Sequence, residues 1–94
     1  MENFNKLTRA EIERLAYLSE ECGEVIQIVG KILRHGYDSY NPLDPKKLDN
    51  RALLNMELSD ILKAMTRMLD SGDIDLNIGK KLYTNSEYWH HQEK

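Results

Sequence analysis

Apolar residues recur at steps of three or four positions through the first part of the chain, which is the period of one face of an α-helix. This first stripe consists of Ile12, Leu15, Leu18, Cys22, Val25, Ile28, Val29 and Ile32. Thr8 and Glu11 have the spacing of a capping box, in which both side chains bind free backbone amides at a helix start. Gly36 suits the residue that follows a helix, because glycine readily takes a left-handed conformation. We therefore predict one long helix from about Thr8 to His35.

A second apolar stripe follows a loop over residues 36–49 that contains both prolines of the chain. This stripe consists of Leu53, Leu54, Leu58, Ile61, Leu62, Met65, Met68 and Leu69. Asp49 or Asn50 is expected to cap this second helix, which should end near residues 70–72, where a serine and a glycine follow an aspartate. A third helix, with a weaker apolar pattern, is predicted over about residues 75–89.

The whole chain has 94 residues, of which 40% are apolar and 31% charged, a composition typical of one soluble globular domain. We therefore predict an all-α fold, a small bundle of about three main helices in one domain over residues 1–94. The net charge of −3 and the spread of acidic residues argue against a nucleic acid duplex as partner. The single cysteine, Cys22, excludes an intrachain disulfide. Apolar runs are too short for a membrane span or a signal peptide, so we expect no membrane partner and a cytoplasmic protein.

Two pairs of acidic residues interrupt the apolar sides of the first two predicted helices. Glu21 and Glu24 are three residues apart, and Glu57 and Asp60 repeat this spacing, which makes the members of each pair neighbours on a helix surface. Burial of an unpaired carboxylate is strongly unfavourable, so the pairs require a cation, a proton or a basic partner. Because hard oxygen ligands suit Mg2+ and also Mn2+, we predict that the two pairs face each other and bind divalent metal.

A solvated helix surface is the alternative for either acidic pair taken alone. Basic side chains could also neutralise the acids, and the nearest in sequence are Lys31, Arg34, Lys63 and Arg67. They lie a turn or more away along the helices, so we do not expect complete neutralisation. A di-iron centre is disfavoured, because neither pair contains the Glu-x-x-His spacing that such sites use.

Residues 15–24 (Leu-Ala-Tyr-Leu-Ser-Glu-Glu-Cys-Gly-Glu) and 57–60 (Glu-Leu-Ser-Asp) resemble the MazG-like branch of the all-α nucleoside triphosphate pyrophosphohydrolases. Residues 31–36 and 38–42 look like short single-domain members, many of them phage-encoded, whose compartment would be the host cytoplasm. The likeness covers roughly residues 7–70. The chain departs from the family pattern in the interval between the two acidic pairs, which the proline-containing loop makes longer than usual.

The resemblance implies a helical fold that binds Mg2+ and splits a nucleoside triphosphate between its α and β phosphates, giving a monophosphate and pyrophosphate. Glu21, Glu24, Glu57 and Asp60 would be the metal ligands. Glu20 and Glu21 would be the catalytic acids, either of which could act as the base on the attacking water. Independently of the resemblance, an anionic phosphate can approach such an acidic site only through bridging cations.

Substrate-binding residues are suggested by the same resemblance. Lys80, Lys81 and Asn85 match the basic and amide groups that family members place on the phosphates, although an exposed helix surface explains them equally well. Tyr17 and His35 could stack on or hydrogen-bond a base, with packing as the alternative for each.

The breadth of the second apolar stripe, which wraps around more than one helix face, indicates that the chain works as a homodimer or homotetramer. The leading hypothesis is Mg2+-dependent hydrolysis of nucleoside or deoxynucleoside triphosphates. Two alternatives are a non-catalytic nucleotide- or metal-binding module and a structural helical adaptor.

Overall fold

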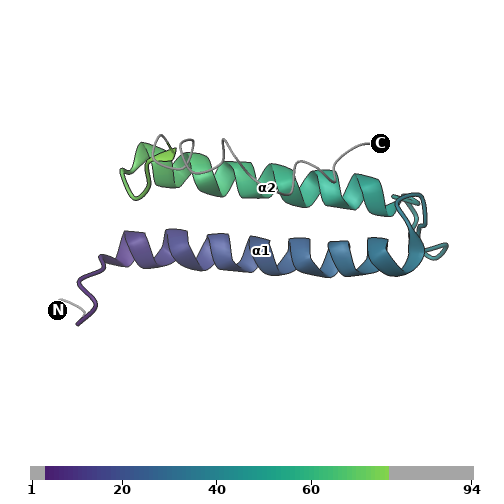
Figure 1. Ribbon diagram of the computed structural model, residues 1–94, viewed down its shortest axis with the longest axis horizontal. Coiled ribbons are helices and arrows are strands. Elements are labelled where there is room, and N and C mark those ends of the chain that lie inside the picture. Colours follow the sequence, from purple (N-terminus) through teal and green to yellow (C-terminus); the bar gives the residue numbers. More distant parts are fainter. Residues whose placement is uncertain (1–3, 77–94) are drawn as a thin grey trace, which may run out of the picture.

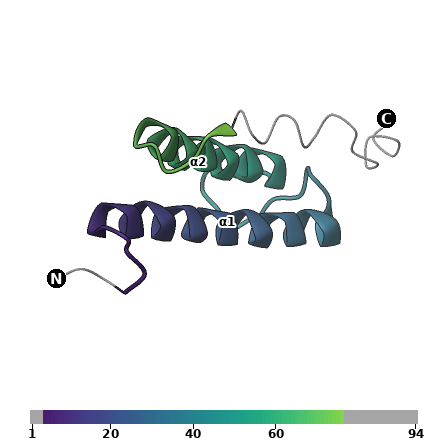
Figure 2. The ribbon, with the colours of Figure 1, turned by 60° about the vertical axis from the view of Figure 1, so that its left-hand side comes forward.

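The computed structural model describes residues 4–76, which form two α-helices, α1 (Arg9–His35) and α2 (Asn50–Asp70). The helices run antiparallel and lie side by side as a helical hairpin (Figure 1), and a second view shows the same arrangement (Figure 2). Within residues 4–76 there is no strand, only an isolated bridge between Tyr40 and Asp49. The all-helical character predicted from the sequence is confirmed. The predicted third helix, apart from residues 75 and 76, lies outside the described residues.

The start of α1 is fixed by the predicted capping box. The Thr8 backbone N–H donates to Glu11 Oε1 at 2.7 Å, and the Glu11 backbone N–H donates to Thr8 Oγ1 at 3.1 Å. At the other end, Gly36 has a φ of 87° and donates its N–H to the Ile32 carbonyl at 2.7 Å. A side chain at Gly36 would be strained at this φ, which explains why the helix ends on a glycine. Both predicted ends of this helix are therefore confirmed.

The bounds of α2 also follow from local chemistry. Asp49 is the N-cap, and its Oδ1 accepts a hydrogen bond from the Ala52 backbone N–H at 2.8 Å. After Asp70, the chain turns through Ser71 and through Gly72, whose φ is 80°. This agrees with the cap and the stop that the sequence predicts.

The loop between the helices is anchored on the first turn of α2. Asn50 is only 6% exposed, and its Nδ2 donates to the Gly36 carbonyl at 3.0 Å while its backbone N–H donates to the Ser39 carbonyl at 2.9 Å. The next residue, Arg51, donates its N–H to the Tyr37 carbonyl at 2.9 Å and places its guanidinium 4.3 Å from the centre of the Tyr37 ring. The loop is thus folded against the helix that follows it.

The open end of the hairpin is joined by an ion pair. Arg14 on α1 donates from Nε to Asp73 Oδ2 at 2.6 Å and from Nη2 to Asp73 Oδ1 at 3.1 Å, and Asp73 lies just beyond α2. The two side chains are 22% and 12% exposed. The pair favours the charged form of both side chains. The hydrogen bond with Asp73 raises the pKa of Arg14, and the hydrogen bond with Arg14 lowers the pKa of Asp73.

The apolar core between the two helices is small. Ile28, Ala64 and Met68 are its buried members within the described residues. Much of the two predicted stripes is more than one-third exposed, including Ile12, Leu15, Val29, Leu58, Leu62 and Leu69. Cys22, which the sequence pattern places in the first stripe, is exposed. The physical reason is that a helix in a two-helix hairpin covers only one side of its neighbour, whereas the stripes are broader than one side.

Neither described helix has the length and apolar character that a membrane crossing needs.

Candidate metal centre

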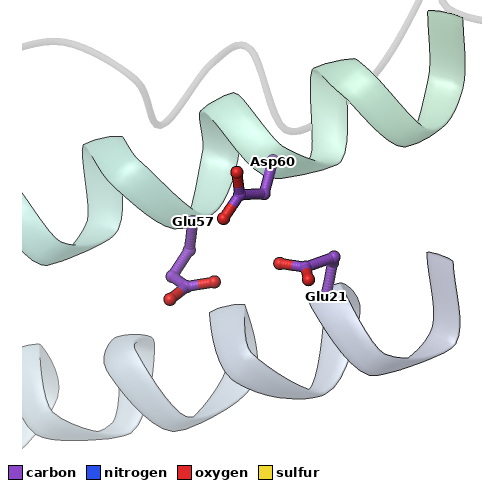
Figure 3. Close-up of side chains that lie close together, drawn as sticks. All are labelled: Glu21, Glu57 and Asp60. Atoms are coloured by element: carbon purple, nitrogen blue, oxygen red, sulfur yellow. The ribbon is translucent and has the colours of Figure 1, made fainter. Parts of the chain in front are cut away.

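Three carboxylates from the two helices meet at the middle of the hairpin. Glu21 projects from α1, while Glu57 and Asp60 project from successive turns of α2 toward it (Figure 3). One oxygen from each of the three side chains lies within 4.8 Å of the others. We call this group the acidic cluster. The antiparallel arrangement produces it, because it brings the middle of α1 opposite the middle of α2.

Burial makes this cluster unlike an ordinary acidic surface. Glu21 is only 7% exposed, although it carries a charge when ionised. Within the described residues, the Oε2 atoms of Glu21 and Glu57 are buried and have no hydrogen-bond partner. A buried acceptor without a donor is normally avoided, because it has lost its water without gaining a replacement. The two orphan oxygens therefore identify a place where a further positive group would be stabilising.

The pKa values of the cluster are displaced toward protonation. A side-chain hydrogen bond with Glu24 is the largest cause that raises the pKa of Glu57 to about 7, followed by burial and by the charges of Glu24, Glu21 and Asp60. Burial is the largest cause that raises the pKa of Glu21, and the charges of Glu24 and Asp60 add to it. Without a cation, the folded chain relieves this repulsion by holding protons.

Counter-charges at the cluster are sparse. Lys63 Nζ lies 3.6 Å from Asp60 Oδ1, and these side chains are 65% and 37% exposed. No other lysine or arginine within residues 4–76 forms an ion pair with a member of the cluster. Of the other candidates for neutralisation, Arg67 lies 5.3 Å from the centre of the Tyr17 ring. The prediction that basic partners would not fully neutralise the acids agrees with these contacts.

The donor set fits a hard divalent cation. All the available ligand atoms are carboxylate oxygens, which are the ligands that Mg2+ and Mn2+ take, and two of them are buried without a partner. Glu24, the fourth predicted ligand, is half-buried one turn after Glu21 and acts directly on the pKa of Glu57. Glu24 thus borders the cluster, although it is not one of the three residues whose oxygens converge.

The other predicted site residues lie at different distances from this group along the hairpin. Glu20 is exposed on α1, next in sequence to Glu21 but outside the three converging carboxylates. Tyr17, one turn before Glu21, lines a hollow of about 330 Å³ beside Arg14 and Arg67. His35 lies at the end of α1, where it lines a second hollow. The predicted phosphate-binding residues lie outside the described residues: Lys80, Lys81 and Asn85.

Two basic residues received no binding role from the sequence, which offered Lys31 and Arg34 only as neighbours of the acids. Both line the second hollow, together with His35, and neither reaches the acidic cluster with an ion pair among the described residues. One signal was present in the sequence: Lys31 has no acidic residue three or four positions away in either direction, and the acid four positions after Arg34, Asp38, lies beyond the predicted end of the helix.

Comparison of the chain with family models, with curated proteins and with solved structures finds no match in any of the three.

Proposed function

We propose that the protein is a Mg2+-dependent nucleoside triphosphate pyrophosphohydrolase of the MazG-like type, acting in the cytoplasm on nucleoside or deoxynucleoside triphosphates. The observation that supports this most strongly is the acidic cluster with its two buried orphan oxygens, on Glu21 and Glu57. A cluster of this kind has to be compensated, and the part of the chain that the structure describes supplies one exposed lysine for it. The resemblance in the two acidic segments adds the reaction type.

In this proposal, Glu21, Glu57 and Asp60 hold the metal, and Glu24 completes the set from the adjoining turn. Bound Mg2+ would neutralise the phosphate charge and make a bound water easier to deprotonate. The carboxylates keep the anionic substrate from binding in the absence of the cation, since they repel it. Glu20, which is exposed beside the cluster, or Glu21 accepts the proton of the attacking water. The bond between the α-phosphorus and its bridging oxygen breaks, and the products are a monophosphate and pyrophosphate.

The test is a panel of nucleoside and deoxynucleoside triphosphates, with Mg2+ or Mn2+, assayed separately for pyrophosphate and for orthophosphate. We expect pyrophosphate from at least one member of the panel, and its loss in Glu24→Gln and in Asp60→Asn. Glu13→Gln and Asp70→Asn are the matched controls, because these two acids are exposed on the same helices away from the cluster. Release of orthophosphate, or equal loss of activity in the control variants, would reject the proposed reaction.

Two other results would redirect the assignment. Tight metal-dependent nucleotide binding without turnover across the panel would favour a non-catalytic binding module. Absence of Mg2+ and Mn2+ binding by calorimetry would favour a structural adaptor in which the acids serve only the fold.

We also propose that the chain works as a homodimer or homotetramer. Support comes from the apolar side chains that the hairpin leaves in contact with solvent, such as Leu33 at 82% exposure and Leu62 at 63%. Such side chains are commonly covered by another copy in helical assemblies. Light scattering at micromolar protein concentration should give at least twice the monomer mass of 11.0 kDa, and the mass of one chain would contradict it.

A further inference from the structure

The loop-end hollow lies where the last turns of α1, the connecting loop and the first turn of α2 come together. It has a volume of about 480 Å³. Figure 2 shows the backbone path in this region, where the loop leaves the end of α1 and returns to the start of α2. Three basic side chains of α1 line it: Lys31, Arg34 and His35. The other sides are formed mainly by polar loop residues, including Ser39 and Asn41, and by apolar residues, Leu48 and Leu53.

The positive charge of this hollow is not used within the hairpin. Among residues 4–76, Lys31, Arg34 and His35 form no ion pair with an acid. Asp44 is the only acid among the lining residues, and one of its oxygens already accepts a hydrogen bond from the Lys46 backbone N–H at 3.0 Å. Basic residues in the last turn of a helix also complement its dipole. The dipole explains their charge, but it does not explain a concave, polar surface around them.

The backbone beside Arg34 leaves room for its guanidinium to lie along the helix. A Cβ placed on Gly30 would be 3.3 Å from Arg34 Nη1, so a larger residue there would press against the guanidinium. The side chain therefore runs back by one turn toward the N-terminus of α1, which is the usual direction of side chains on a helix. That direction is toward the acidic cluster.

The loop-end hollow lies nearer the loop than the acidic cluster does, and Lys31 is on the side of α1 that carries Glu24, the acid that borders the cluster. Lys31 follows Glu24 by seven residues, which turn the helix through two full turns less about 20°. The two residues therefore lie on nearly the same side of α1, about 10.5 Å apart along its axis. On α2, Leu53 precedes Glu57 by one turn. Along α1, the basic side chains of the hollow therefore follow the acid that borders the cluster, in the direction of the loop. At about 10 Å, physiological salt screens most of the repulsion that the acids exert on an anion in the hollow.

We propose that the loop-end hollow binds a pyrophosphate-type anion through Lys31 and Arg34. Phosphoryl oxygens carry several charges at neutral pH and match both guanidinium and ammonium donors. If the proposed function holds, on which this second step rests, the hollow takes the leaving pyrophosphate of the triphosphate. The nucleotide then lies along the hairpin with its distal phosphates toward the loop and its nucleoside toward Tyr17.

The test is a calorimetric titration of inorganic pyrophosphate into the full chain, in EDTA and at physiological salt. We expect binding by the wild type and at least about tenfold weaker binding by the double variant Lys31→Gln/Arg34→Gln, because two charge-assisted contacts are lost. The matched control is Arg9→Gln/Lys46→Gln, which removes two positive charges that do not line the hollow and should bind like the wild type. Circular dichroism establishes that each variant is folded.

Two results would overturn the assignment of the hollow: no pyrophosphate binding by the wild type in EDTA, or equal affinities for the double variant and the control. The outcome is separable from that of the proposed function. If no nucleotide is hydrolysed but the double variant alone loses pyrophosphate, the hollow stands and the hydrolase proposal falls. If nucleotides are hydrolysed and the double variant shows unchanged KM and unchanged product inhibition by pyrophosphate, the hydrolase stands and the hollow has no part in it.

Discussion

The open end and the middle of the hairpin both bring charged side chains together. The charges neutralise each other at the open end and repel each other in the middle. At the open end, Arg14 and Asp73 neutralise each other through two hydrogen bonds, at 2.6 and 3.1 Å. In the middle, Glu21, Glu57 and Asp60 face one another with oxygens within 4.8 Å. The first contact lowers the pKa of its acid, whereas the second raises the pKa values of Glu21 and Glu57. One is a completed ion pair, and the other is a group of three acids whose charges repel one another.

The contrast shows that the fold does not need unpaired acids in order to join its helices. An arginine in the place of one cluster acid would convert the repulsion into a contact like that of Arg14 and Asp73. Two buried oxygens of the cluster instead have no donor within residues 4–76. We infer that the cluster is kept for a ligand that brings positive charge, and that the pair at the open end is kept for stability.

The largest expected effect is a difference in enzymatic activity between a variant of the acidic cluster and a variant of the Arg14–Asp73 pair. Glu21→Gln should lower metal-dependent pyrophosphate release by on the order of 100-fold or more, since changes even in the outer partners of metal ligands cost 10–100-fold. Asp73→Asn should keep activity within a few-fold at a temperature where it is folded. Initial rates at saturating Mg2+ measure both. Similar losses in the two variants would mean that the acidic cluster and the Arg14–Asp73 pair do not differ in their importance for activity.

The next effect concerns the melting temperature, which variants at the two places should shift in opposite directions. In EDTA, Glu57→Gln should raise the melting temperature, because it removes one of several mutually repelling charges, and addition of Mg2+ should then stabilise this variant less than the wild type. Asp73→Asn should lower the melting temperature equally with and without Mg2+. Differential scanning fluorimetry under both conditions gives the comparison. A fall for Glu57→Gln in EDTA would show that its charge is compensated within the fold.

The pH dependence of stability should also run in opposite directions. The pKa of Glu57 rises from 4.5 to about 7 on folding, so the folded chain holds a proton that the unfolded chain releases. The free energy of unfolding in EDTA should therefore fall as the pH rises from about 4.5 to about 7. The lowered pKa of Asp73 acts in the other direction, since its contribution is present above the ordinary pKa of an aspartate and is lost as the pH falls below it.

Urea denaturation at several pH values, in EDTA, measures this dependence. Glu57→Gln should flatten the decline between pH 5 and 7, and saturating Mg2+ should do the same in the wild type by occupying the ionised form. A decline of unchanged steepness in Glu57→Gln would assign it to other groups.

The smallest expected effect concerns Lys63, the lysine that pairs with the cluster among the described residues. Lys63 Nζ lies 3.6 Å from Asp60 Oδ1 and is 65% exposed. An exposed pair of this kind contributes about 0.2–1 kcal/mol, so Lys63→Gln should tighten Mg2+ binding by at most about fivefold. Lys46→Gln is the matched control, with no change expected. Weaker Mg2+ binding by Lys63→Gln would mean that the lysine supports the metal site instead of competing with it.

Features that depend on neighbours in sequence could be predicted well. The capping box at Thr8 and Glu11, the cap at Asp49 and the glycine after α1 are local, and the structure has each of them. The meeting of Glu21 with Glu57 and Asp60 was also predictable, because the spacing of each acidic pair placed it on an apolar helix face and an antiparallel hairpin brings two such faces together.

Features that depend on distant parts of the chain could not be predicted. The ion pair of Arg14 with Asp73 joins residues 59 positions apart, and nothing in the local pattern of either indicates the other. The loop-end hollow requires the path of the loop, which is set by the hydrogen bonds of Asn50. The exposure of Cys22 and Leu62 was missed because periodicity identifies an apolar side but not how much of it a partner helix covers.

The most direct measurement of the central claim is Mn2+ binding followed by electron paramagnetic resonance, with Mg2+ as competitor. We expect the wild type to bind Mn2+ and Mg2+ to displace it. Glu21→Gln and Asp60→Asn should bind at least about tenfold more weakly, while Asp73→Asn binds like the wild type. Equal Mn2+ binding by the wild type and Glu21→Gln, or no binding by the wild type at millimolar Mn2+, would mean that the acidic cluster is not a metal site.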